Sequence, residues 1–216
     1  MGNVPKPTII KNFEIISDTT YYAFYQEQNC ISTASKMDYF DFSGDGYIIS
    51  LKDKYRYLIQ EPITLPIKNG NKTITSVGNF GVYEDQGSDK IIKIPSIYFL
   101  NNGIEGNYTE IKDFAFWSAK QGSSINENRV LLQDIYLPSS IKTIGTEAFC
   151  GCKTLETINL PNALDENYGI TTIGRYAFNS TGNLIIEENN NYKPLMKVIN
   201  IGVSAFYQAG SRIYLT

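Results

Sequence analysis

The chain has 216 residues, of which 42% are hydrophobic, and it carries a formal net charge of −3 with a sequence pI of about 5.1. This length allows one domain or two, and a slightly acidic chain with scattered Lys and Arg lacks the electrostatic footprint of a nucleic-acid-binding protein. Histidine is absent, which excludes Ser-His-Asp and Cys-His activation of a nucleophile and removes the commonest metal ligand.

The first 60 residues are predicted to form a β-rich cap. Residues 8–16 and 19–26 are rich in Ile, Tyr and Phe and are typical of strands. The stretch 17–25 is weakly similar to the closing strand of small β-grasp-like repeats, so residues 1–60 are interpreted as a cap or a partial β-grasp-like unit. Residues 1–20 lack the apolar stretch of a signal peptide. No run of about 18 apolar residues predicts a membrane span, so no membrane insertion is expected.

Residues 39–50 predict a strand, a turn and a second strand, with Ser-Gly-Asp-Gly at the turn. The same loop has a calcium interpretation, because Asp41, Ser43 and Asp45 occupy the first, third and fifth places of an EF-hand loop. The twelfth place is Lys52, where a bidentate Glu is required. The pattern therefore favours a hairpin turn over a calcium site.

One sequence motif recurs along the rest of the chain. Ile-Gly-x-x-Ala-Phe begins at Ile144, Ile173 and Ile201, with a less similar copy at Ile111 and a degenerate copy at Val77. The starts are 34, 33, 29 and 28 residues apart, and self-similarity at such a period is the sequence signature of a solenoid. The repeated phenylalanines are expected in the core: Phe116, Phe149, Phe178 and Phe206. So are the small residues four positions after each alanine: Ala119, Cys152, Thr181 and Ala209.

A second sequence motif, Ile-x-Leu-Pro, alternates with the first along the chain. It begins at Ile63, Ile135 and Ile158, with a variant at Ile92 and shortened copies near the C-terminus. Apolar and exposed positions alternate, as in a strand with one buried face, and the proline then ends the ladder. Residues 61–216 are therefore predicted to form a mainly β solenoid with short helical or 3-10 turns, without a cap at its C-terminal end and preceded by a small antiparallel β cap.

The three cysteines match neither a disulfide framework nor a metal site. Cys30 is distant in sequence from Cys150 and Cys152, and an odd number at this spacing is no disulfide pattern. A structural zinc site needs four ligands, and the chain offers no second cysteine pair. We expect Cys152 to be buried and its neighbour to lie near the surface, with no metal and no cofactor.

The most specific form of the pattern lies at residues 138–161, which read Pro-Ser-Ser-Ile-Lys-Thr-Ile-Gly, then Ala-Phe-Cys-Gly-Cys, Leu and Ile-Asn-Leu-Pro. These motifs resemble the BspA-like (treponemal-type) leucine-rich repeat family, and the resemblance extends over residues 63–216. It implies a curved right-handed solenoid of the kind found in bacterial surface proteins and phage tail proteins, working in adhesion and recognition rather than catalysis. It also implies a location at the cell surface or outside the cell, or alternatively in a virion.

An enzyme is not expected. Carboxylate pairs can hydrolyse glycosides, but the acidic neighbours in this sequence lie in insertions with nothing to hold them at a defined separation: Glu84 and Asp85, Asp165 and Glu166, and Glu187 and Glu188. No glycine-rich phosphate loop is present either.

The outward positions of the repeated strands are the candidate binding face. Aligned strands of a solenoid present their outer residues as one surface. The expected residues are Lys93, Tyr136, Asn159 and Tyr214, with Asp134, Thr157 and Arg212 one strand step earlier. An ordinary solvated sheet would show the same alternation. Two functions remain open: a module that binds a protein or glycan on a host or neighbouring cell, and a structural or receptor-binding subunit of a phage tail or other multi-subunit assembly.

Overall fold

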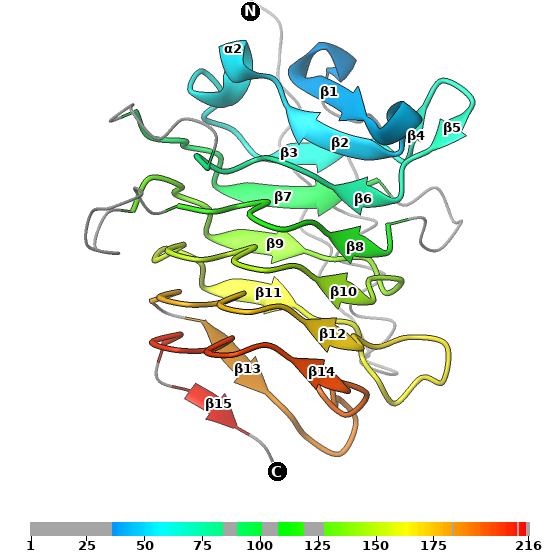
Figure 1. Cartoon of the computed structure of the whole chain (residues 1–216), viewed down its shortest axis with the longest axis vertical. Helices are drawn as coiled ribbons and strands as arrows, with labels where there is room; N and C mark the ends of the chain where they lie inside the picture. Colours follow the sequence, from blue (N-terminus) through cyan, green and yellow to red (C-terminus); the bar gives the residue numbers. More distant parts are fainter. Residues whose placement is uncertain are drawn as a thin grey trace, which may run out of the picture.

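The chain winds into coils that stack along one axis, with β1 and α2 at one end and β15 at the other (Figure 1). The computed structural model describes residues 36–83, 90–100, 108–118, 128–182, 184–210 and 212–214, with the backbone alone at 185, 187 and 212–214. The predicted strands at 8–16 and 19–26 lie outside these residues, as do Cys30 and Ala119. In chain order the elements are η1 Met37–Tyr39, β1 Phe40–Ser43, η2 Gly44–Gly46, β2 Ile48–Leu51, α2 Asp53–Arg56, β3 Ile63–Leu65, β4 Lys68–Asn69, β5 Lys72–Thr73, β6 Ser76–Val77, β7 Ser96–Phe99, β8 Glu110–Ile111, β9 Asp134–Tyr136, β10 Thr143–Ile144, β11 Thr157–Asn159, β12 Thr172–Ile173, β13 Ile185–Glu187, β14 Asn200–Ile201 and β15 Arg212–Tyr214.

Short strands from successive coils stack into two columns, which Figure 1 shows side by side. The seven-stranded sheet has the order β1-β2-β6-β8-β10-β12-β14, and the four-stranded sheet has the order β11-β9-β7-β3. Strands β13 and β15 pair in parallel as a separate sheet, and β4 and β5 form an antiparallel ribbon. The predicted mainly β solenoid with few, short helical turns is confirmed.

The Ile-Gly-x-x-Ala-Phe motif begins at the end of a short strand, which the sequence pattern did not predict. In β10, Thr143 and Ile144 precede the repeated glycine and pair in parallel with β8 and β12. Ile144 and Ile173 turn inward and are almost fully buried, whereas Ile201, at the same position in the last coil, is 61% exposed. Each coil therefore covers the apolar edge of the coil before it.

The repeated glycine is needed for close approach between coils, and not for a left-handed backbone turn. Gly145, Gly174 and Gly202 do not have positive φ. A Cβ on Gly174 would lie 2.4 Å from the backbone nitrogen of Thr146 in the preceding coil. The left-handed backbone falls two residues later, at non-glycine positions, each of which costs about 1–2 kcal/mol. These residues are Phe114, Glu147, Tyr176 and Ser204.

Stacked phenylalanine rings form the centre of the core. The ring of Phe149 lies 5.0 Å from that of Phe116 and 5.3 Å from that of Phe178, nearly parallel to both. Phe206 stacks on Phe178 at 5.2 Å and is half-buried. In the degenerate first copy, Phe80 continues the column. The predicted core phenylalanines are thus confirmed, and so are the three small residues that the structure describes: Cys152, Thr181 and Ala209.

The predicted hairpin before the solenoid is also confirmed. Phe40 in β1 pairs with Leu51 in β2 in an antiparallel ladder around η2. Strand β2 then pairs in parallel with β6, so this small antiparallel cap continues the seven-stranded sheet. The division of the chain at residue 60 stays a prediction. In the part of the chain that the structure describes, no helix is long and apolar enough to cross a membrane.

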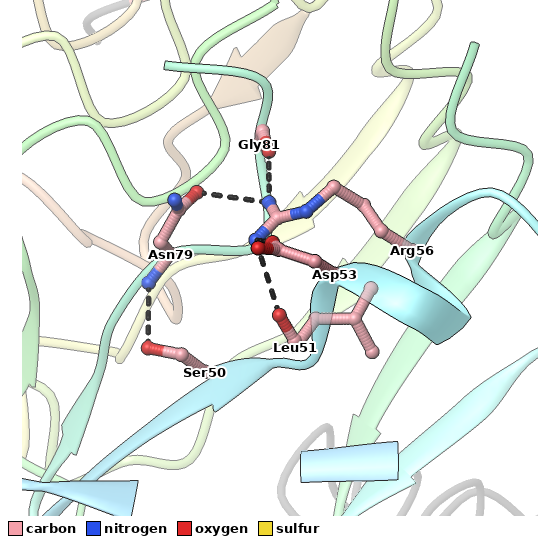
Figure 2. Close-up of polar contacts among 6 residues, drawn as sticks. All are labelled: Ser50, Leu51, Asp53, Arg56, Asn79 and Gly81. Atoms are coloured by element: carbon pink, nitrogen blue, oxygen red, sulfur yellow. Dashed lines mark hydrogen bonds and ion pairs between the residues drawn. The ribbon is translucent and has the colours of Figure 1, made fainter. Parts of the chain in front are cut away.

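Arg56, the last residue of α2, closes the N-terminal end of the coil stack (Figure 2). In later coils, the carbonyl just after the repeated Phe position accepts an N–H from the preceding coil: Ser118 N donates to Cys150 O over 2.9 Å, and the next two coils repeat this bond. Gly81 holds the same position in the first coil. There the guanidinium of Arg56 supplies the donor, since its Nη1 donates to Gly81 O.

The remaining bonds of Arg56 bring three further groups to the same point. Nη1 donates to Asn79 Oδ1 over 3.1 Å, and Nη2 donates to Leu51 O over 3.1 Å and to Asp53 Oδ1 over 3.0 Å. The side chain of Arg56 is 4% exposed, whereas that of Asp53 is 91% exposed. Arg56 therefore ends the array by satisfying buried carbonyl groups, with its ion pair on the outside.

Candidate recognition face

The candidate face is the outer side of the four-stranded sheet. Ile63, Ile97, Ile135 and Ile158 lie in register across β3, β7, β9 and β11 and point into the core. Because side chains alternate along a strand, the residues on either side of these isoleucines point outward. The outer positions form two rows. One row is Thr64, Tyr98, Tyr136 and Asn159; the other is Ser96, Asp134 and Thr157.

Two tyrosines stand at the centre of this face. The rings of Tyr98 and Tyr136 are 4.9 Å apart and inclined by 5°. That separation matches the spacing of neighbouring strands, so the rings stand upright on β7 and β9 and each covers one face of the other. Both side chains are half-buried. The pair forms a ridge between the shorter side chains of Thr64 and Asn159.

Polar contacts hold the residues beside the ridge. Asn159 Oδ1 accepts a hydrogen bond from Leu137 N over 2.5 Å, and its Nδ2 donates to Leu137 O over 3.1 Å. This amide therefore extends the ladder between β9 and β11. On the other row, Ser96 Oγ donates to Asp134 Oδ2 over 3.1 Å, which fixes the carboxylate, while Thr157 is exposed.

The face carries a small negative charge. Strands β3, β7, β9 and β11 contain no Lys or Arg, and Asp134 is their one ionisable carboxylate. Four of the predicted residues therefore share one surface, with Asp134 and Tyr136 on β9 and Thr157 and Asn159 on β11.

Lys93 was assigned wrongly to this face. It is exposed, but the strand of its coil is β7, which begins after Pro95. Ile92 forms an isolated bridge with Val130, and Pro95 O accepts hydrogen bonds from Gln133 N and from the N–H of Asp134, the first residue of β9. Proline keeps its carbonyl acceptor although it has no N–H, so here it precedes the strand where we expected it to follow.

Arg212 and Tyr214 lie on β15, which is not part of the four-stranded sheet. Their backbones pair with Ile185 and Glu187 of β13, and this two-stranded sheet is not hydrogen-bonded to β11. Four of the seven predicted residues therefore lie on the four-stranded sheet, and Arg212 and Tyr214 lie on a two-stranded sheet whose strand β13 contacts β11.

The residue that the sequence interpretation missed is Tyr98, with Ser96 and Thr64 beside it. A usable signal was present, because Ser-Ile-Tyr-Phe at 96–99 has the same polar and apolar pattern as Asp-Ile-Tyr-Leu at 134–137. A comparison of the strands with one another, in addition to the search for Ile-x-Leu-Pro, would have placed Tyr98 opposite Tyr136.

The described cysteines lie in the core, away from this face. Cys152 is fully buried, as predicted, and its Sγ donates to Phe116 O over 3.0 Å. Cys150 is also buried, so its expected place near the surface was wrong. Its side chain is covered next to Trp117, which donates from Nε1 to Glu147 Oε2 over 3.1 Å. Burial, with a smaller contribution from the Glu147 charge, raises the pKa of Cys150 to about 12, and burial also raises the pKa of Cys152.

The comparisons with known proteins identify the repeat. The family model described as BspA type leucine-rich repeat region matches residues 122–214 in six copies. This region is a BspA-type leucine-rich repeat array. The resemblance inferred from the sequence motifs is thereby confirmed. No curated protein matches the sequence of this chain.

Solved structures similar to this chain include other leucine-rich repeat proteins. The crystal structure of a T. pallidum leucine-rich repeat protein is similar with a TM-score of 0.53 and 20% identity, over 82% of this chain and 68% of that chain. At this identity the likeness shows the fold alone. A leucine-rich cell surface protein from Faecalibacterium prausnitzii A2-165 has a TM-score of 0.39 and 15% identity, over 83% of this chain and 53% of that chain. The chain spans about half the length of that second protein.

Proposed function

We propose that this protein is a non-enzymatic recognition module that binds a partner through the outer face of its four-stranded sheet. The observation that carries this proposal is the stacked pair of Tyr98 and Tyr136 at the centre of that face. Tyrosine provides a large, rigid contact area and a polar tip at low cost in side-chain entropy. The strands beneath the two rings belong to a continuous solenoid core, so the contact surface is preorganised.

The BspA-type repeat supports an adhesive role over a catalytic one. Repeats of this kind stack into extended surfaces that are suited to recognition, and the buried, high-pKa thiols of Cys150 and Cys152 are unsuited to act as nucleophiles. The partner would be a protein or glycan on a host or neighbouring cell, and the module would act at the cell surface or outside the cell. No observation favours the phage-tail or virion role that the resemblance also allowed, and that role is not part of the proposal.

Replacing both tyrosines is expected to remove binding while the fold is kept. A Tyr98→Thr, Tyr136→Thr variant loses the aromatic ridge but retains residues with high strand propensity. Truncation of central tyrosines at an interface commonly costs about 2 kcal/mol or more each, so the affinity of the fluorescently labelled protein for intact bacterial and animal cells should fall by more than about tenfold. Flow cytometry over a concentration series measures this change.

The matched control removes an exposed tyrosine from another part of the molecule. Tyr207 is 57% exposed and lies in a turn of the last coil, so Tyr207→Thr should leave cell binding unchanged. Circular dichroism melting curves should be similar for all three proteins. Undiminished binding by the double variant, or an equal loss in the Tyr207 variant, would contradict the choice of face.

A further inference from the structure

We infer that the partner is a neutral glycan, bound between the protruding ring of Tyr136 on β9 and the lower surface of the neighbouring strand β11. This inference rests on the proposed function, because it names the ligand class of the same face. Tyr98 covers one side of the Tyr136 ring. In the strand order β11-β9-β7-β3, the other side of that ring faces β11, whose outward residues Thr157 and Asn159 are much shorter. An aromatic wall therefore stands beside a lower polar floor.

The chemistry of this site matches the two surfaces of a pyranose ring. The axial C–H groups of a sugar form an apolar face that can pack against an aromatic ring, since the face of the π-system is electron-rich and apolar. Sugar hydroxyls need hydrogen-bonding partners once they leave water. Asp134, on the same strand as Tyr136, provides a carboxylate acceptor, and Thr157, paired with it in register on β11, provides a hydroxyl that donates or accepts.

The polar groups around this site are held in place before a ligand arrives. Ser96 Oγ fixes one oxygen of the Asp134 carboxylate, and the two hydrogen bonds of Asn159 to Leu137 hold that amide down against the strand. The second oxygen of Asp134 can accept from a sugar hydroxyl. A charged acceptor forms stronger hydrogen bonds than a neutral one, so this carboxylate would contribute to selectivity.

The charge of the face favours a neutral ligand over an anionic one. The four strands carry Asp134 and no Lys or Arg, whereas sialylated and sulfated glycans require cationic partners for their acidic groups. A basic peptide would suit the carboxylate, but it would leave the aromatic wall and the Thr157 hydroxyl without a defined role. Neutral hexose units use all three groups.

An array of immobilised oligosaccharides tests the ligand class directly. The labelled full chain should be retained by neutral oligosaccharides and not by their sialylated or sulfated counterparts. With the best neutral oligosaccharide as the titrant, Asp134→Ala and Thr157→Val should each weaken binding by about tenfold, since each removes a hydrogen-bonding group of the site. Tyr207→Thr, which lies outside the face and is exposed, should bind as the native protein does.

Treatment of the cells separates this inference from the proposed function. Periodate, which cleaves the vicinal diols of sugars, should abolish cell binding, and protease treatment should not. Binding that survives periodate but is lost after proteolysis, and is lost in the Tyr98→Thr, Tyr136→Thr variant, would overturn the glycan and leave the recognition face standing with a protein partner. Retention of acidic oligosaccharides in place of neutral ones would also overturn it. Full binding by the double variant would instead contradict the proposed function itself.

Discussion

Replacement of Arg56 by Met should lower the free energy of unfolding by about 2–6 kcal/mol, because it leaves two buried carbonyl acceptors unsatisfied at a cost of about 1–3 kcal/mol each. The change keeps a long apolar stem in place of the arginine stem. It leaves Gly81 O and Leu51 O without the donors that Arg56 gives them. Urea denaturation followed by circular dichroism measures the loss, with the m-value as a check that the unfolded state is unchanged.

The Asp53→Asn variant separates the carbonyl cap from the ion pair. Asp53 is 91% exposed, and an exposed ion pair contributes less than about 1 kcal/mol. We expect this variant to unfold close to the native midpoint. If Asp53→Asn destabilised the protein as much as Arg56→Met, the role of Arg56 would be that of an ion-pair partner, and the capping account would be wrong.

Replacement of Phe149 by Ala should lower the free energy of unfolding by about 3–5 kcal/mol, as expected for loss of a fully buried ring and creation of a cavity. Phe149 is 0% exposed and lies between Phe116 and Phe178 in the ring column. Its removal therefore breaks two stacked contacts, each of which adds to the burial of apolar area. The same urea titration measures the change.

The comparison variant is Phe206→Ala, at the same repeat position in the last coil. Phe206 is half-buried and stacks on Phe178. Less apolar area leaves the core, so a loss of about 1–2 kcal/mol is expected. Equal losses at Phe149 and Phe206 would show that the column does not gain stability from neighbours on both sides.

The core was predictable because the interior coils pack against their neighbours in the same way. An interior coil covers the one before it and is covered by the next, so Ile144 and Ile173 recur at one inward position and Phe149 and Phe178 at another. Such positions accept few residue types, and their recurrence survives in the sequence. Ile201 keeps the same identity although it is 61% exposed, which shows that sequence identity reports the repeat and not the burial of each copy.

The recognition face was only partly predictable. Residues 92–99 contain two overlapping runs with a period of two, and a local pattern cannot decide which run forms the strand. The register is decided by long-range hydrogen bonds, since Pro95 O accepts from Gln133 N and Asp134 N in the next coil. Tyr98 then falls opposite Tyr136, and Lys93 falls outside the sheet.

The capping role of Arg56 has no local sequence signal. Its partner Gly81 O lies 25 residues away and needs a donor because no earlier repeat coil lies among the residues that the structure describes. The degenerate first copy of the motif makes this relation harder to predict. The motif places the ring five residues after Val77, at Val82, but Phe80 occupies the ring column. The turn of the first coil is therefore two residues shorter than in the other coils. The repeat pattern predicts contacts between successive coils, and it does not predict the contacts that close the first coil.

Both the core and the recognition face depend on one coil register, and thiol accessibility tests that register most directly. In a Cys30→Ser variant, only Cys150 and Cys152 remain. Both are buried with raised pKa, and the thiolate is the reactive form. At about pH 8, near the usual pKa of a cysteine thiol, we expect Ellman's reagent to modify neither thiol in the native protein and both in denaturant. Rapid modification of Cys152 in the native protein would contradict the register and, with it, the placement of Tyr98 beside Tyr136.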